Sequence, residues 1–195
     1  MKSSLRRVGP FPGLRCVFLD RDGVINRKPP EGSYISAWSD FELLAGAEEA
    51  IGRLNRAGCK VLVISNQRGI ALGFYTAEVV EQLHARLQLH LQAQGAHIDG
   101  FYFCPHEKGE CSCRKPEIGL FKQAQREFAA AAPERSVMIG DSLSDIEAAV
   151  RFGCRSIFVK GDPNTRKPGS ETAEKLADGT VESLAEAVDA MLSKR

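Results

Sequence analysis

Two acidic residues one position apart could carry covalent chemistry in this sequence. Asp20 and Asp22 follow directly on the apolar run LRCVFL, and Gly23 comes next. A carboxylate can attack a phosphorus atom as a nucleophile, and a second carboxylate can give and take a proton. Gly23 allows the sharp turn that brings the backbone close to a ligand. The spacing therefore indicates a phosphoryl-transfer site, although the same residues are also typical of a solvated turn.

Three more polar motifs lie beyond later apolar runs. Ser65 follows KVLVI, and Asp141 follows SVMIG. The basic pair Arg114-Lys115 lies ten residues beyond GFYFC. A hydroxyl and an ammonium group can hold phosphoryl oxygens, and a carboxylate can hold Mg²⁺. Asp145, one helical turn beyond Asp141, could orient Lys115 or the metal ligands. Singly these residues also fit a loop, a solvated basic pair or a helix N-cap, but together they supply what phosphoryl transfer requires.

Short apolar runs alternate with segments of helical spacing along most of the chain. Strands are predicted at 14–19, 60–64, 100–104, 136–139 and 156–159. Helices are predicted at 41–57, 76–94, 117–132, 144–152, 172–176 and 181–192, with a short strand or turn at 179–181. The alternation predicts an α/β fold, a single doubly wound, Rossmann-like parallel sheet with helices on both faces. Ligands of such sheets bind at the carboxyl ends of the strands, so the polar motifs should meet there.

The ordered motifs resemble those of the haloacid dehalogenase-like phosphatases over roughly residues 14–159. The resemblance implies that Asp20 is the nucleophile and a Mg²⁺ ligand. It also implies that Asp22 is the general acid and base, with its backbone carbonyl on the metal. Ser65 and Lys115 would stabilise the phosphoryl group, and Asp141 would be the remaining carboxylate on Mg²⁺. The rival of another class is a catalytically inactive, zinc-stabilised binding module, which would have no need of all five residues.

A second set of possible metal ligands lies just before the basic pair. Three thiolates and an imidazole occur within ten positions, at Cys104, His106, Cys111 and Cys113. This set fills a tetrahedral Zn²⁺ site without an open position, so the predicted zinc is structural and rigidifies a short loop. A redox pair or unligated thiols are the alternative. The remaining cysteines, Cys16, Cys59 and Cys154, are predicted to be small buried hydrophobic residues.

The zinc pattern narrows the resemblance to the branch with D-glycero-D-manno-heptose 1,7-bisphosphate phosphatases and histidinol-phosphate phosphatases. The run NQRGIA at 66–71, followed by Gly73, is closer to the heptose enzymes, whereas the short zinc loop is closer to the histidinol enzymes. The implied substrate is a small phosphorylated metabolite: a sugar bisphosphate used in making activated heptose, or alternatively histidinol phosphate. Arg114 would recognise the distal phosphate or the sugar. The candidate substrate-binding residues are Asn66, Gln67, Arg68 and Arg114.

The chain is predicted to hold a flexible N-terminal arm, residues 1–13, and one domain, residues 14–195. The segments 24–41 and 70–114 are too short for an inserted cap domain, so the site should be open. Tyr34 and Trp38 could contact the sugar or anchor the loop at the rim. The three histidines on or just beyond the longest predicted helix, His84, His90 and His97, are expected at the surface or at the boundary of the core.

Composition limits the classes of partner. Hydrophobic residues make up 43% and the net charge is +1, which suits a globular core and shows no basic excess for nucleic acid. No apolar run approaches the roughly 20 residues of a membrane span, and the N-terminus lacks a secretory pattern. A monomer in a reducing cytoplasm is expected, with no membrane or nucleic-acid partner.

Overall fold

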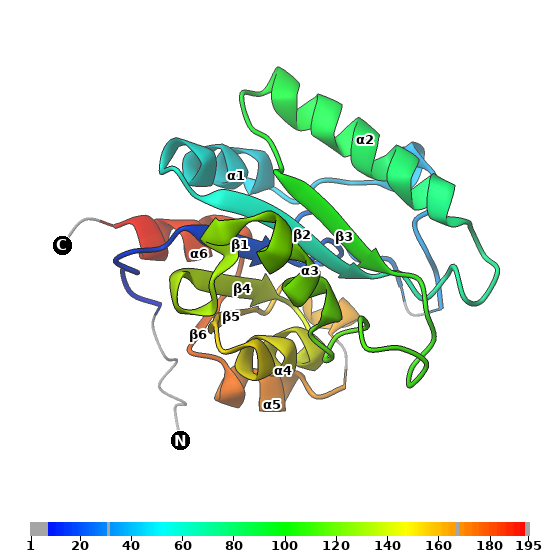
Figure 1. The fold of residues 1–195 in the computed structure, drawn as a ribbon. Helices are drawn as coiled ribbons and strands as arrows, with labels where there is room; N and C mark the ends of the chain where they lie inside the picture. Colours follow the sequence, from blue (N-terminus) through cyan, green and yellow to red (C-terminus); the bar gives the residue numbers. More distant parts are fainter. Residues whose placement is uncertain (1–7, 31, 167, 194–195) are drawn as a thin grey trace.

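The computed structural model describes residues 8–30, 32–166 and 168–193. Six parallel strands form one sheet in the order β3-β2-β1-β4-β5-β6 (Figure 1). They are β1 (Cys16–Leu19), β2 (Lys60–Asn66), β3 (Gly100–Cys104), β4 (Ser136–Gly140), β5 (Arg155–Val159) and β6 (Gly179–Val181). Leu19 of β1 pairs with Val63 of β2 and with Ile139 of β4. The residues that follow β1 and β4 therefore emerge side by side at one edge of the sheet.

Helices cover both faces of this sheet (Figure 1). One face is covered by α1 (Ala47–Arg56), α2 (Ala77–Ala93) and α6 (Leu184–Leu192), the other by α3 (Gly119–Glu127), α4 (Leu143–Phe152) and α5 (Ser170–Leu176). Alternate residues of β1 enter the two cores, with Leu19 on the first face and Phe18 on the second, and both are fully buried. A strand covered on both faces must be apolar throughout, which explains the run that precedes Asp20.

The predicted doubly wound parallel sheet is confirmed, and the five predicted strands agree with the structure to within two residues. The helix predicted at 41–57 begins only at Ala47, because Gly46 takes the left-handed conformation with φ 77° at its N-cap. The helix predicted at 117–132 ends at Glu127. Short 3₁₀ turns lie in the connections: η1 (Trp38–Asp40), η2 (Ala129–Ala131), η3 (Pro133–Arg135) and η4 (Pro163–Thr165).

The predicted N-terminal arm lies partly outside the described residues, which begin at residue 8. Its described part contacts the domain: Val8 and Phe11 pack against the core, and the Phe11 N–H donates to the carbonyl of Met191 (3.2 Å). In the described ranges no cap domain is inserted into the sheet. Among the same residues no helix is long and apolar enough to cross a bilayer.

Candidate active site

Three carboxylates meet at the carboxyl edge of the two central strands. Asp20 follows β1 and Asp141 follows β4, while Asp145 lies in the first turn of α4. One carboxylate oxygen from each of the three residues lies within 4.8 Å of the other two. Asp145 is fixed by a capping box, in which it accepts hydrogen bonds from the backbone N–H and the hydroxyl of Ser142 (3.0 and 2.6 Å). Closely spaced carboxylate oxygens are the ligands that Mg²⁺ prefers, so the cluster fits the predicted cation.

The ammonium group of Lys115 is buried within this cluster. Its Nζ lies 2.8 Å from Asp20 Oδ1 and 2.6 Å from Asp145 Oδ1. Burial alone would lower the pKa of Lys115, but Asp145 and Asp20 more than offset it, so the pKa is raised and the group stays charged. Burial raises the pKa of Asp20 to about 7 despite the opposing charge of Lys115. The sequence left two roles open for Asp145, orienting Lys115 or the metal ligands, and the structure shows it both in contact with Lys115 and within the carboxylate cluster.

The end of β2 holds the backbone that carries Lys115. Asn66 Nδ2 donates to the carbonyl of Lys115 (3.1 Å), and the Lys115 N–H donates to Asn66 Oδ1 (3.0 Å). Both polar ends of the Asn66 amide are thus engaged with backbone. The Ser65 hydroxyl is buried and accepts a hydrogen bond from Gln67 Nε2 (2.7 Å). These contacts join the end of β2 to the cluster around Asp20.

The carboxylate of Asp22 is held by a largely buried polar network. Arg21 donates from Nε and Nη2 to Oδ1 (both 3.1 Å), Asn26 Nδ2 donates to Oδ1 (2.9 Å), and Gln67 Nε2 donates to Oδ2 (3.2 Å). The Tyr75 hydroxyl donates to Gln67 Oε1 (2.8 Å) and fixes that amide. Burial raises the pKa of Asp22, but Arg21 and the hydrogen bonds outweigh it, so the pKa is lowered. Asp22 is therefore ionised in this arrangement.

Two side chains of this network were not predicted from the sequence. Arg21 is 1% exposed, and His84 Nε2 lies 3.4 Å from its Nη1 while the imidazole stacks on Phe101. The prediction that His84 lies at the surface or at the boundary of the core was wrong, since it is buried with 4% exposure. Burial, followed by the charge of Arg21, lowers the pKa of His84 to about 3, so the ring is neutral. Its spacing from Val80 and Leu87 on the apolar stripe of α2 was a signal that could have placed it inside.

An open cleft of about 1280 Å³ lies beside Asp22 and Lys115. Two of the candidate substrate-binding residues on its wall are tied to the loop that carries the cysteines. Arg68 Nε pairs with Glu107 Oε2 (2.5 Å), and Arg114 Nη1 donates to the carbonyl of His106 (3.2 Å). The rim therefore presents guanidinium groups at positions set by that loop.

The loop after β1 forms another wall of the cleft. Tyr34 lines it and stacks on Phe74, with ring centroids 4.9 Å apart. Trp38 instead stacks on Phe41 (5.1 Å) and packs against the core, which anchors the loop. Lys28 from this loop also lines the cleft, and its Nζ pairs with Asp141 Oδ2. No motif or periodicity in the sequence pointed to Lys28.

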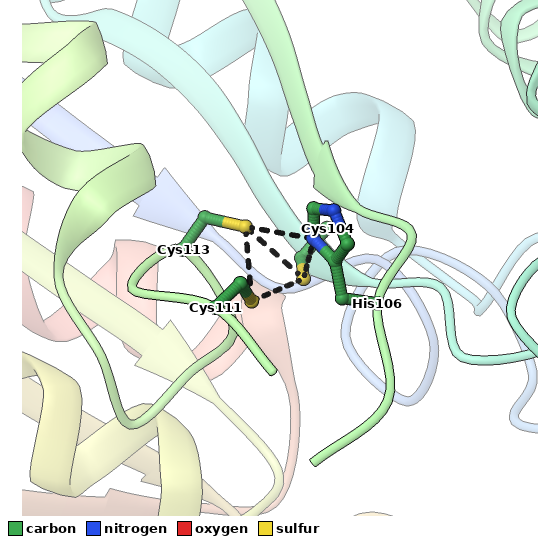
Figure 2. Close-up of side chains that lie close together, drawn as sticks. All are labelled: Cys104, His106, Cys111 and Cys113. Atoms are coloured by element: carbon green, nitrogen blue, oxygen red, sulfur yellow. Dashed lines mark hydrogen bonds between the residues drawn. The ribbon is translucent and has the colours of Figure 1, made fainter. Parts of the chain in front are cut away.

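The four predicted zinc ligands converge in one cluster (Figure 2). Five of the six distances between their ligand atoms are 3.3–3.6 Å. A tetrahedral Zn²⁺ with bonds of about 2.3 Å to sulfur places its sulfur ligands about 3.8 Å apart, so the donor set fits this ion. All six cysteines are free thiols. Those outside the cluster, Cys16, Cys59 and Cys154, are buried as predicted.

Several known proteins are similar to this chain in sequence and in fold. Residues 112–187 match a family model described as "HAD-hyrolase-like". The chain is 38% identical over 175 residues to a D-glycero-alpha-D-manno-heptose-1,7-bisphosphate 7-phosphatase of Mycobacterium bovis, covering 87% of both chains. It is 36% identical over 182 residues to a D-glycero-beta-D-manno-heptose-1,7-bisphosphate 7-phosphatase of Photorhabdus laumondii, covering 89% of this chain and 93% of the relative. The crystal structure of a D,D-heptose 1,7-bisphosphate phosphatase from B. bronchiseptica, complexed with magnesium and phosphate, aligns with a TM-score of 0.80 and 28% identity. That alignment covers 90% of this chain and 97% of the other.

Proposed function

We infer the function from the fact that this chain belongs to the haloacid dehalogenase-like D-glycero-D-manno-heptose-1,7-bisphosphate 7-phosphatase family. We propose that it removes the 7-phosphate of that heptose bisphosphate in the synthesis of nucleotide-activated heptose. The observation that carries this proposal is the position of Asp20, at the end of β1, in contact with Lys115 and within 4.8 Å of Asp141. In this arrangement the proposed nucleophile Asp20, the ammonium group of Lys115 and the proposed Mg²⁺ ligand Asp141 can act on one phosphoryl group.

Asp20 is the proposed nucleophile. One of its carboxylate oxygens attacks phosphorus, an aspartyl-phosphate forms, and the bond between phosphorus and the sugar oxygen breaks. The departing oxygen takes a proton from Asp22, while Lys115 and Ser65 hold phosphoryl oxygens. When bound by Asp20, Asp141 and the backbone carbonyl of Asp22, Mg²⁺ supplies positive charge for the phosphoryl group.

Asp22 acts again in the second half of the reaction. It takes a proton from a water molecule that attacks phosphorus, which releases inorganic phosphate and regenerates Asp20. The ionised carboxylate seen beside Arg21 suits this uptake of a proton. In the first half-reaction Asp22 must instead carry a proton, so its contact with Arg21 has to loosen when substrate binds.

The zinc cluster has a structural role in this proposal. Its four ligands leave no open position for substrate or for an activated water. We also propose that the protein works as a monomer in the cytoplasm. The free state of all six cysteines fits a reducing compartment.

Arg114 is the proposed contact for the distal phosphate. A forked guanidinium contact to a second phosphate is charge-assisted and stabilises the complex by about 1.5–3 kcal/mol, or roughly ten- to a hundredfold in specificity. Histidinol phosphate, the alternative substrate, lacks a second phosphate and carries a cationic amine. Paired kcat/KM measurements on both substrates, with wild type and Arg114→Ala, test the choice. A higher wild-type value for histidinol phosphate would reject the heptose assignment.

The catalytic assignment is tested separately by phosphate release from the heptose bisphosphate in the presence of Mg²⁺. The Asp20→Asn protein should keep its circular dichroism spectrum and lose turnover, because an amide cannot form the aspartyl-phosphate. Turnover near the wild-type rate by a folded Asp20→Asn protein would exclude Asp20 as the nucleophile.

A further inference from the structure

Lys28 places a second ammonium group against the carboxylate cluster. Its side chain and that of Asp141 are each 8% exposed, and the Nζ pairs with Asp141 Oδ2. A lysine this buried is uncommon unless it has a charged partner, because its ammonium group loses hydration. The motifs described above assign no role to this residue, although it lines the cleft and contacts a proposed metal ligand.

The loop that carries Lys28 is fixed by its own contacts. Asn26 Nδ2 donates to the carbonyl of Arg27 (2.9 Å), and the Arg27 N–H donates to the carbonyl of Glu42 (2.7 Å). The side chains of Arg27 and Glu42 also form an ion pair at the surface (2.7 Å). These contacts hold the backbone one residue before Lys28, so its ammonium group is presented to Asp141 by an ordered segment.

The other side of Asp141 is closed by the turn after the nucleophile motif. Gly23 has φ 98°, and a Cβ at this position would lie 2.2 Å from Asp141 Oδ2. The same oxygen that accepts from Lys28 therefore rests against the Gly23 backbone. Asp141 is held between a glycine turn and an ammonium group, and a cation binding at this carboxylate must compete with Lys28.

Formal charge shows what Lys28 adds. Asp20, Asp141 and Asp145 carry three negative charges when ionised, and Lys115 and Lys28 carry two positive charges. Without Lys28 the group would carry a net charge of about −2, which a divalent cation alone would neutralise. With Lys28 present, bound Mg²⁺ leaves a net positive charge, and that charge favours a phosphoryl dianion.

We propose that Lys28 is a second phosphoryl-binding ammonium group, which pairs with Asp141 until Mg²⁺ takes that carboxylate and then turns to a phosphoryl oxygen. This inference rests on the proposed magnesium-dependent function. It predicts effects of opposite sign when Lys28 loses its charge: Mg²⁺ alone binds more tightly, and phosphate binds more weakly to the magnesium-loaded protein.

Calorimetric titration with MgCl₂, and then with inorganic phosphate at saturating Mg²⁺, tests both effects without turnover. In Lys28→Met the Mg²⁺ affinity should rise roughly tenfold. Repulsion between a unit positive charge and a divalent cation about 5 Å away weakens binding of the cation by roughly this factor even in bulk water, and the variant removes that charge. The phosphate affinity should fall roughly tenfold with the loss of a charge-assisted hydrogen bond. Lys28→Arg should keep wild-type behaviour in both titrations. Lys122→Met, which removes one charge from an exposed position on α3, is the matched control and should change neither affinity.

The outcomes separate the two levels of the proposal. If wild type binds Mg²⁺ and Lys28→Met binds it with the same affinity, or binds phosphate with unchanged affinity, the role of Lys28 is overturned and the catalytic proposal stands. If wild type itself binds neither Mg²⁺ nor phosphate, the magnesium site of the proposed function fails. The rise in melting temperature on adding Mg²⁺ gives a second measure, and it should be larger in Lys28→Met than in wild type.

Discussion

Replacing Asn66 by alanine removes both hydrogen bonds that fix the backbone of Lys115. These bonds are 3.0 and 3.1 Å long and connect both polar ends of one side chain to one residue. Each contributes roughly 0.5–1.5 kcal/mol net, so the free energy of unfolding should fall by about 1–3 kcal/mol in Asn66→Ala. The ammonium group of Lys115 then loses its precise placement beside Asp20, and kcat should fall roughly ten- to a hundredfold.

Urea unfolding measures the first effect, and steady-state kinetics on a sugar phosphate and an aryl phosphate measure the second. In the proposed mechanism Lys115 holds the phosphoryl group that both substrates share, so both should lose the same factor in kcat. Arg68→Ala is the contrasting variant, because Arg68 lies on the cleft wall and pairs with Glu107 of the rim. Its loss should affect the sugar phosphate alone. If Asn66→Ala is impaired only on the sugar phosphate, Asn66 binds substrate directly and the reasoning from Lys115 is refuted.

Three other variants test separate parts of the site. Asp22→Asn should be impaired far more on a sugar phosphate than on nitrophenyl phosphate, because only the sugar oxygen needs a proton to leave; equal losses would exclude the acid role. Zinc should copurify at about one ion per chain, and Cys113→Ser should lower the melting temperature and the zinc content together, as elemental analysis and thermal unfolding will show. The pKa of His84 is lowered to about 3 in the folded chain, so the unfolded chain binds an extra proton below about pH 6.5. As the pH is lowered from roughly 6 to 4, this group should therefore reduce the free energy of unfolding by about 1.4 kcal/mol per pH unit. Urea unfolding at several pH values measures this dependence, and a His84→Gln protein with the same dependence of the unfolding free energy on pH as wild type would contradict the prediction.

The sequence alone could predict that Asp20 and Asp141 lie close together, because their positions follow from the geometry of parallel strands. Parallel strands that pair in register end at one edge, so acids directly after β1 and β4 had to meet, and the structure brings Asp20 and Asp141 together. The cluster of three cysteines and a histidine could also be predicted from the sequence, since its members lie close together along the chain. Their convergence needed only one loop to fold back.

The sequence did not predict the site residues whose position depends on contacts with distant segments of the chain. Lys28 lies in a loop between prolines and other polar residues, where no periodicity states which way a side chain points. Arg21 belonged to a recognised motif, but nothing in its type predicts a fully buried guanidinium held by Asp22 and His84. His84 lies on the apolar stripe of α2, but its polar residue type favours the surface unless a buried partner is present. In each case the polar partner that makes burial favourable comes from a distant segment.

The cluster of Cys104, His106, Cys111 and Cys113 is connected through the backbone to Lys115. Cys113, Arg114 and Lys115 are consecutive, and the Arg114 N–H donates to Cys111 Sγ (3.4 Å), so the last proposed zinc ligand lies two residues from the ammonium group proposed to hold the phosphoryl group. The Gln67 N–H donates to the carbonyl of Cys104 (2.8 Å), which attaches the same cluster to the end of β2. Lys115 is thus fixed from one side by the cluster and from the other by Asn66. If this cluster binds zinc as proposed, it would help to set the position of Lys115 without touching substrate, and loss of the metal should then lower kcat as well as stability.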